Sequence, residues 1–221
     1  IICMVVVTLI PLGVLAYYAL TDPATGAFTL ANIRNLNMYW GVLWQSILYS
    51  LVSAFICLLL GYPVAYYIAH CKATTQKILY MLVMLPMCMS FLLRTLAWVG
   101  LLQDTGIIND MLEAVGIGRK QLIRTPGAVI LGMVYNYLPY MILPLYSTIV
   151  KINPRLIEAA EDLGCNTLQV FQRVTLPLSV PGILSGITMV FVPAVSTFYI
   201  SQKLGGTDTV LIGDVIERQF K

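Results

Sequence analysis

The sequence predicts an all-α membrane protein that crosses the bilayer several times. Hydrophobic residues make up 59% of the 221 residues and charged residues only 10%, whereas soluble domains carry about 25% charged residues. The mean hydropathy is +0.85. Five apolar stretches are long enough to cross a bilayer, because a transmembrane helix needs about 20 predominantly apolar residues. Long stretches with so little charge indicate transmembrane helices.

The five predicted spans cover residues 1–20, 40–69, 78–102, 126–150 and 178–204. The first starts without an initiator Met inside an apolar run, so we expect a truncated transmembrane helix in preference to a signal peptide. Prolines interrupt every span. A carbonyl freed by proline is costly in lipid, so such kinks are expected to face protein or a water-filled cavity, as in a transporter core. The prolines are Pro11, Pro63, Pro86, Pro139, Pro144, Pro181 and Pro193.

The connection between the last two predicted spans has the signals of a helical hairpin. Asn153 followed by Pro154 predicts a helix start, since Asn caps free N–H groups and Pro fits the first helical position. Gly164 predicts the stop, because glycine enters the left-handed conformation cheaply. Asn166 then caps a second short helix, which the Leu176-Pro177 pair is expected to close. A charged hairpin between two spans indicates a docking element for a soluble partner.

The same residues resemble the EAA loop of ABC importer permeases. The pattern is Glu158-Ala159-Ala160, then Gly164, Val174 and Leu176-Pro177; the family usually has Ile at the position of Val174. In that family the loop is the cytoplasmic coupling helix that fits a groove on the ATPase subunit. The resemblance therefore implies a set of ATPase-coupling residues, which are Glu158, Ala159, Ala160, Gly164, Leu176 and Pro177.

Further segments resemble the polyamine branch of these permeases, the PotB-type subunits of spermidine/putrescine importers. They are residues 93–95 with Trp98, 106–109, Pro139 with 144–147, and 205–206 with 211–213. The resemblance implies one permease domain over residues 1–221 with the coupling hairpin at 153–177, and a sixth helix beyond residue 221. It also implies a second permease subunit of PotC type, two ATPase subunits and an extracytoplasmic binding protein. The chain departs from this branch at one position that bears on the cargo. It has Ser201-Gln202 where the branch often has Ser-Asp, so a carboxylate that would suit a cationic cargo is missing there.

Three residues are candidates for the substrate pathway. Arg94 lies inside the third predicted span, where an unpaired charge costs roughly 2.5–3.5 kcal/mol on insertion scales, and it is therefore a functional candidate. It alternatively snorkels, or pairs with a carbonyl freed by Pro86. Trp98 and Tyr146 offer aromatic faces to a polyamine, since cation–π contacts contribute about 0.5–2 kcal/mol each. The predicted spans contain no acidic residue, which argues against a tight polyamine site within them.

Two other functions remain open at this level: a permease of the same class for another small solute, and a secondary transporter without an ATPase. The second accounts for the kinked helices but leaves the EAA pattern unexplained. An enzyme has little support, because one histidine and no carboxylate in the spans leave few acid–base groups. The chain has no GxxxxGK[ST] phosphate loop, so we expect ATP to bind the partner ATPase and the chain itself to need no cofactor.

Charge and cysteine content exclude further classes. A net charge of +3 is too small and scattered to indicate nucleic acid, and the five cysteines and His70 predict neither a disulfide nor a metal site. The loop cations are too evenly divided to orient the chain by the positive-inside rule. Orientation follows from the EAA resemblance alone, which places residues 70–77 and 153–177 in the cytoplasm of a protein of the bacterial inner membrane.

Overall fold

The computed structural model describes residues 9–14, 17, 19–21, 39–116, 118–206 and 209–219. The chain divides into two compact units, Ile1–Trp44 and Gln45–Lys221. In the first unit, residues 9–14 and 19–20 are helical, and the Thr21 hydroxyl donates to the carbonyl of Tyr17 over 2.7 Å. The predicted first span lies largely outside the described residues.

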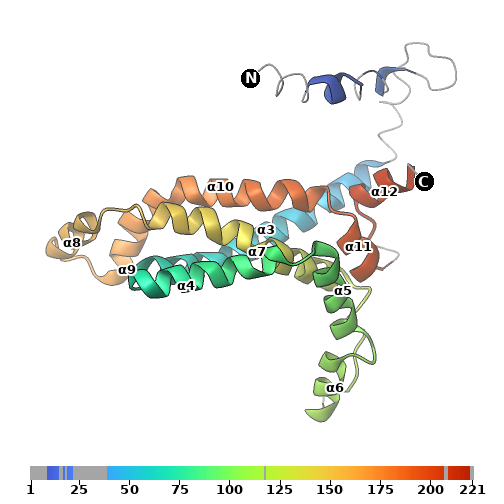
Figure 1. Ribbon diagram of the computed structural model, residues 1–221, viewed down its shortest axis with the longest axis horizontal. Helices are drawn as coiled ribbons and strands as arrows, with labels where there is room; N and C mark the ends of the chain where they lie inside the picture. The colour runs from blue at the N-terminus through green and yellow to red at the C-terminus, as the bar shows by residue number, and fades with distance from the viewer. Residues whose placement is uncertain are drawn as a thin grey trace. The chain divides into compact units, whose positions relative to one another are not determined.

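The described residues are almost entirely helical, which confirms the predicted fold class (Figure 1). The long helices are α3, α7 and α10, and each of the other helices has 12 residues or fewer. In chain order the elements are α3 Trp40–His70, α4 Ala73–Met84, a 3-10 turn Leu85–Cys88, α5 Phe91–Leu102, α6 Ile107–Ala114, α7 Pro126–Ile149, α8 Pro154–Asp162, α9 Thr167–Val170, a π-helix Phe171–Thr175, α10 Leu176–Val195, α11 Tyr199–Leu204 and α12 Ile212–Gln219.

Within the described residues, four helical segments are long and apolar enough to cross a membrane. They are Trp40–His70, Phe91–Ala114, Pro126–Ile149 and Thr167–Val195. Two of them agree with the predicted spans 40–69 and 126–150 to within one residue. These two stretches are apolar along their whole length and have short polar boundaries, so composition alone places their ends.

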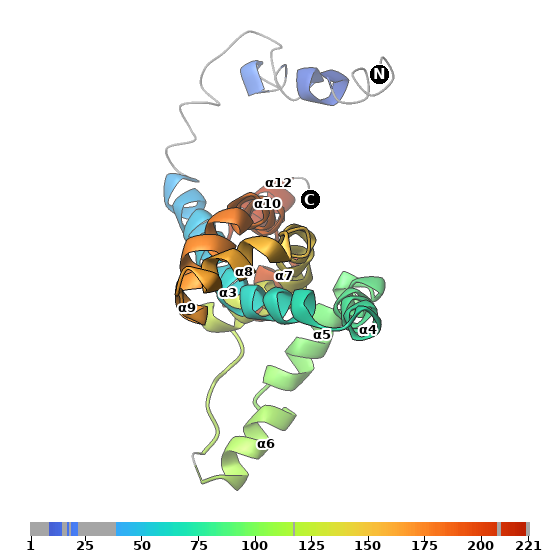
Figure 2. The same cartoon turned by 90° about the vertical axis from the view of Figure 1, so that its left-hand side faces the viewer.

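The other two predicted spans are wrong in their extent. The stretch 78–102 is interrupted, because α4 ends in the 3-10 turn and Met89 is extended with φ −85° and ψ 147° before α5 starts. Pro86 lies in that turn and has no N–H to continue the helical ladder. The stretch 178–204 also breaks: α10 ends at Val195, two residues after Pro193, and α11 begins at Tyr199. Figure 2 shows α5 and α6 leading away from the α3, α7 and α10 group.

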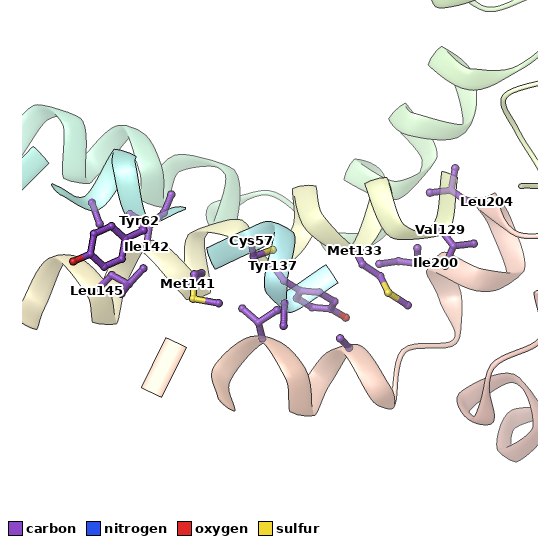
Figure 3. Packing of buried hydrophobic residues seen from close by; sticks show 14 of the residues in the cluster. Cys57, Tyr62, Val129, Met133, Tyr137, Met141, Ile142, Leu145, Ile200 and Leu204 are labelled. Carbon is purple, nitrogen blue, oxygen red and sulfur yellow. The ribbon is translucent and has the colours of Figure 1, made fainter. Parts of the chain in front are cut away.

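The core of the second unit is built on α7, which packs along α10 (Figure 1). Every fourth residue on one side of α7 is buried, as expected for one face of a helix. Figure 3 shows Met133, Tyr137 and Met141 of this face pointing into the space between the helices, with Cys57 of α3 beside them. The full row is Val129, Met133, Tyr137, Met141, Leu145 and Ile149.

Glycines let the helices approach closely, as is usual where membrane helices pack. A Cβ added to Gly182 of α10 would lie 2.8 Å from the Thr148 Cβ and 3.0 Å from the Pro144 carbonyl oxygen of α7. Hydrogen bonds between the helices accompany this packing. The hydroxyls of Tyr62 and Ser179 lie 2.9 Å apart and join α3 to α10, and the Ile212 N–H of α12 donates to the Ser46 hydroxyl of α3 over 2.7 Å.

Candidate functional site

Helix α8 of the predicted hairpin begins and ends where the sequence signals indicated. The Asn153 side-chain oxygen accepts from the Arg155 N–H over 3.1 Å, and Pro154 takes the first turn. At the other end Gly164 has φ +82°. The N–H of Gly164 donates to the Glu161 carbonyl over 2.8 Å and the N–H of Cys165 to that of Ala160 over 3.1 Å. This pair of bonds is the Schellman motif, which requires the left-handed residue that glycine supplies.

Helix α9 starts with a complete capping box. The Asn166 side chain accepts from the Gln169 N–H and the Gln169 side chain accepts from the Asn166 N–H, each over 2.9 Å. The expectation that Leu176-Pro177 closes this helix is wrong. The chain stays helical from Thr167 to Val195, and Leu176 donates to the Phe171 carbonyl across a π-turn. Pro177 directly follows the π-helix, and local π adjustments of this kind accommodate a proline in a membrane helix, so α9 continues into a span without a break in the helix.

The capping box makes a measurable prediction. Replacing Asn166 by alanine is expected to destabilise the start of α9 by about 1 kcal/mol, because the Gln169 N–H loses its acceptor. Hydrogen exchange of the full chain in detergent would show faster exchange at residues 166–170 only. Thr167→Ala, at the exposed neighbouring position, serves as the control. Equal exchange in the two variants would contradict the assignment of Asn166 as the cap.

The hairpin rests on the ends of the spans through its inner face. A cavity of about 150 Å³ lies between them, with Pro154 and Ile157 of α8 on one side and Ala69, Ile149 and Thr175 of α3, α7 and the π-helix on the other. Figure 1 shows α8 at this end of the unit. The two connections predicted to be cytoplasmic, 70–77 and 153–177, therefore meet at one end of the helices. The assignment of this end of the helices to the cytoplasmic side of the membrane stays a prediction.

The outer face of the hairpin leaves apolar side chains in the open. Leu156, Leu163 and Leu168 are 48%, 86% and 63% exposed. Glu158 and Ala159 are exposed beside them and Ala160 is half-buried. At Gly164 an added Cβ would meet nothing within 4 Å. Exposed leucines on a short capped element are typical of a surface that binds another protein.

The structure gathers most of the predicted coupling residues. Glu158, Ala159 and Ala160 lie on α8, and Gly164 forms the turn that follows it. Leu176 and Pro177 lie apart from this outer face, at the base of the hairpin where α10 begins, and both are exposed. Their roles in coupling stay predictions.

The predicted substrate-pathway residues have three different surroundings. Arg94 of α5 lines a cavity of about 460 Å³ bounded by α5, α7 and the junction of α10 with α11. The Trp98 ring packs edge-on against Tyr135 with centroids 5.3 Å apart, and the Tyr146 ring lies 5.2 Å from that of Tyr80. Only Arg94 lines this cavity, and all three roles stay predictions.

Arg94 is buried, with 7% of its surface exposed. Its Nε and Nη1 atoms have no hydrogen-bond acceptor in the described structure, so the expected pairing with a carbonyl freed by Pro86 is not seen at these atoms. Asn136 of α7 also lines the cavity, and its Oδ1 has no donor. Sequence reasoning missed Asn136, although an amide in the middle of an apolar span is a polar group that needs partners.

A carboxylate lies beside the position where the sequence departs from the polyamine branch. The Gln202 amide of α11 donates to the Glu217 carboxylate of α12. The two residues are 15 positions apart in the sequence, so the sequence alone does not show that they are neighbours. An acidic group is therefore present next to residue 202, although residue 202 is not itself acidic.

Cysteines and possible metal ligands are spread out in the described part of the chain. Cys57, Cys71, Cys88 and Cys165 are free thiols, and Cys3 lies outside the described residues. The described residues contain no group of three His, Cys, Asp or Glu side chains that could hold a metal ion.

Comparison with known proteins defines the class. Residues 61–219 match the family of binding-protein-dependent transport system inner membrane components, and the chain belongs to this family. It is therefore an inner membrane permease component of an ABC transport system, as the EAA pattern predicted. A chain of a bacterial ABC transporter that imports the acidic polysaccharide alginate has the same fold, with a TM-score of 0.70 and 21% identity over 99% of this chain and 80% of that one.

Among individual proteins, the chain is similar to spermidine/putrescine transport system permease proteins. It is 43% identical over 196 residues to PotB of Haemophilus influenzae, covering 87% of this chain and 68% of that protein. It is 39% identical over 197 residues to PotB of Escherichia coli K12, covering 87% and 72%. It is 30% identical over 232 residues to the E. coli inner membrane ABC transporter permease protein YdcU, covering 96% and 72%.

Proposed function

We propose that this chain is a permease subunit of an ATP-driven importer of polyamines, with spermidine and putrescine as the cargo. The proposal of a polyamine cargo is based on the 39–43% identity to PotB permeases over 87% of the chain. The carboxylate of Glu217 beside Gln202 supports a cationic cargo at this end of the helices. The helices α3, α5, α7 and α10 contain no Asp or Glu, so further countercharges come from the partner subunits.

Energy reaches the chain through the hairpin 153–177, which docks on a cytoplasmic ATPase. The exposed Leu156, Leu163 and Leu168 supply apolar contact area for that docking. The continuous helix from Thr167 to Val195 would transmit movement of the docked hairpin into the membrane. ATP is bound and hydrolysed by the ATPase, and the complex also contains a second permease subunit of PotC type and an extracytoplasmic binding protein.

Reconstitution tests this proposal. The full-length protein, purified with its associated chains and placed in liposomes with the cognate binding protein, is expected to show ATPase activity that spermidine or putrescine stimulates. Alginate oligosaccharide and sulfate serve as control solutes and are expected to have no effect. Stimulation by a control solute instead would retain the permease class and reject the polyamine cargo.

The same preparation separates the proposal from a secondary transporter. An ATPase subunit and a second permease are expected to co-purify with the chain and to be identified by mass spectrometry. Uptake that persists without any ATPase, driven by an imposed ion gradient, would reject ATP-driven transport.

A further inference from the structure

Arg94 is a buried charge for which the described residues show no ion-pair partner. Arg94 is only 7% exposed, and its side chain ends in a guanidinium group. Its Nε and Nη1 find no acceptor, and α3, α5, α7 and α10 contribute no carboxylate. Buried charges in membrane proteins are paired. The two unpartnered nitrogen atoms therefore point to an acceptor from outside these helices.

The cavity beside Arg94 has room for such a group. It measures about 460 Å³, and its walls include Asn136, Tyr140 and Phe198. The Asn136 Nδ2 donates to the Gly132 carbonyl over 2.9 Å. This bond orients the amide and leaves Oδ1 as an unpartnered acceptor. The cavity is thus lined by a buried cation and by an oriented acceptor.

The position of the cavity indicates how the occupant arrives. Asn136 lies near the middle of α7, which spans 24 residues. Leu92, Leu93 and Phe198 nearby are 49%, 61% and 42% exposed, so the surroundings are suited to lipid or to another apolar helix. A dissolved anion would have to lose its hydration to enter here, which is costly. A carboxylate on a transmembrane helix is brought to this depth by its apolar neighbours.

We infer that the Arg94 cavity receives an acidic side chain from a transmembrane helix of the paired permease subunit. This inference rests on the proposed function, because it needs a second permease in the complex. Arg94 forms the ion pair, and Asn136 Oδ1 accepts from a water or an N–H group that enters with the partner helix. The arginine also repels a polyamine, so the cavity is a subunit contact and is separate from the cargo path.

Co-purification of the second permease with Arg94 variants tests this inference. Arg94→Met keeps most of the side-chain volume and removes the charge. It is expected to lower recovery of the second permease by roughly a hundredfold, since removal of one member of a buried pair leaves the other unpaired. Arg94→Lys is expected to retain more of it. Arg119→Met is the control, because the Arg119 side chain is 52% exposed and pairs with the surface carboxylates of Asp110 and Glu113.

Charge reversal identifies the partner residue. In cells carrying Arg94→Glu, changing the contacting acidic residue of the second permease to arginine is expected to restore recovery of the complex. If Arg94→Met leaves recovery unchanged, the inference is wrong while the proposed permease complex stands. If the wild type recovers no second permease, both are wrong. A free anion as the occupant would instead appear as sulfate stabilisation of the isolated chain that Arg94→Met abolishes, with recovery unchanged, and would also overturn the inference.

Discussion

Uptake is expected to fall to the level of cells lacking the transporter when Gly164 is replaced by aspartate, while the amount of protein in the membrane is unchanged. Gly164 has φ +82°, and an added Cβ meets nothing within 4 Å in the chain itself. Aspartate is one of the few residues that enter the left-handed region at little cost. The hairpin therefore keeps its fold, and the new carboxylate obstructs only the surface that docks on the ATPase. ATP hydrolysis by the complex is expected to continue without uptake.

A matched glycine provides the control. Gly116 follows α6 in the same way that Gly164 follows α8, with φ +84° and open space around its Cβ position. Gly116→Asp is expected to retain uptake, because α6 is remote from the hairpin. Gly164→Asn separates the effect of the added charge on uptake from the effect of the added side-chain volume, since asparagine is uncharged and also accepts the left-handed conformation. Wild-type uptake by a fully inserted Gly164→Asp protein would contradict the coupling role of the hairpin.

The second large effect is expected at the contact between α7 and α10. Gly182→Ala is expected to destabilise the protein by about 1–3 kcal/mol, the usual cost of adding a methyl group to a packed interior. The new Cβ would lie 2.8 Å from the Thr148 Cβ and 3.0 Å from the Pro144 carbonyl oxygen. Both atoms are held by the α7 backbone, so they cannot turn aside as a flexible side chain would. Thermal unfolding in detergent measures the loss.

An exposed glycine in another helix isolates this effect. At Gly100 of α5 an added Cβ meets nothing within 4 Å. Gly100→Ala is therefore expected to leave stability unchanged or to raise it by up to about 1 kcal/mol through helix propensity. Equal midpoints for Gly182→Ala and Gly100→Ala would show that the two helices are packed less closely than the structure indicates.

Local signals predicted the hairpin well because each acts within one turn of chain. The Asn153 cap, the left-handed Gly164 and the Asn166 cap depend on backbone groups two or three residues away. The ends of α3 and α7 were predictable for a related reason, since the length of an apolar run sets where a helix leaves the bilayer. The coupling role of these residues was predicted from family resemblance and awaits the uptake experiment.

Continuity of the other helices was not predictable from hydropathy. An apolar run has the same composition whether its helix continues through a proline or breaks at it. Pro144 lies inside the unbroken α7, whereas Pro86 lies in the turn between α4 and α5. The difference depends on which neighbouring groups accept the interrupted backbone, and those neighbours come from elsewhere in the chain.

The sequence by itself determined the class of this protein: apolar length specifies a polytopic helical membrane protein, local caps specify its hairpin, and the resemblance of the EAA pattern indicates a permease. Tertiary structure alone decided which groups meet across the bundle. It placed Glu217 beside Gln202 and Trp98 against Tyr135. It also left the Arg94 Nε and Nη1 and the Asn136 Oδ1, all at one cavity, without hydrogen-bond partners among the described residues. The physical reason is that capping and helix length act along the chain, whereas charge pairing and packing act between segments that only the fold brings together.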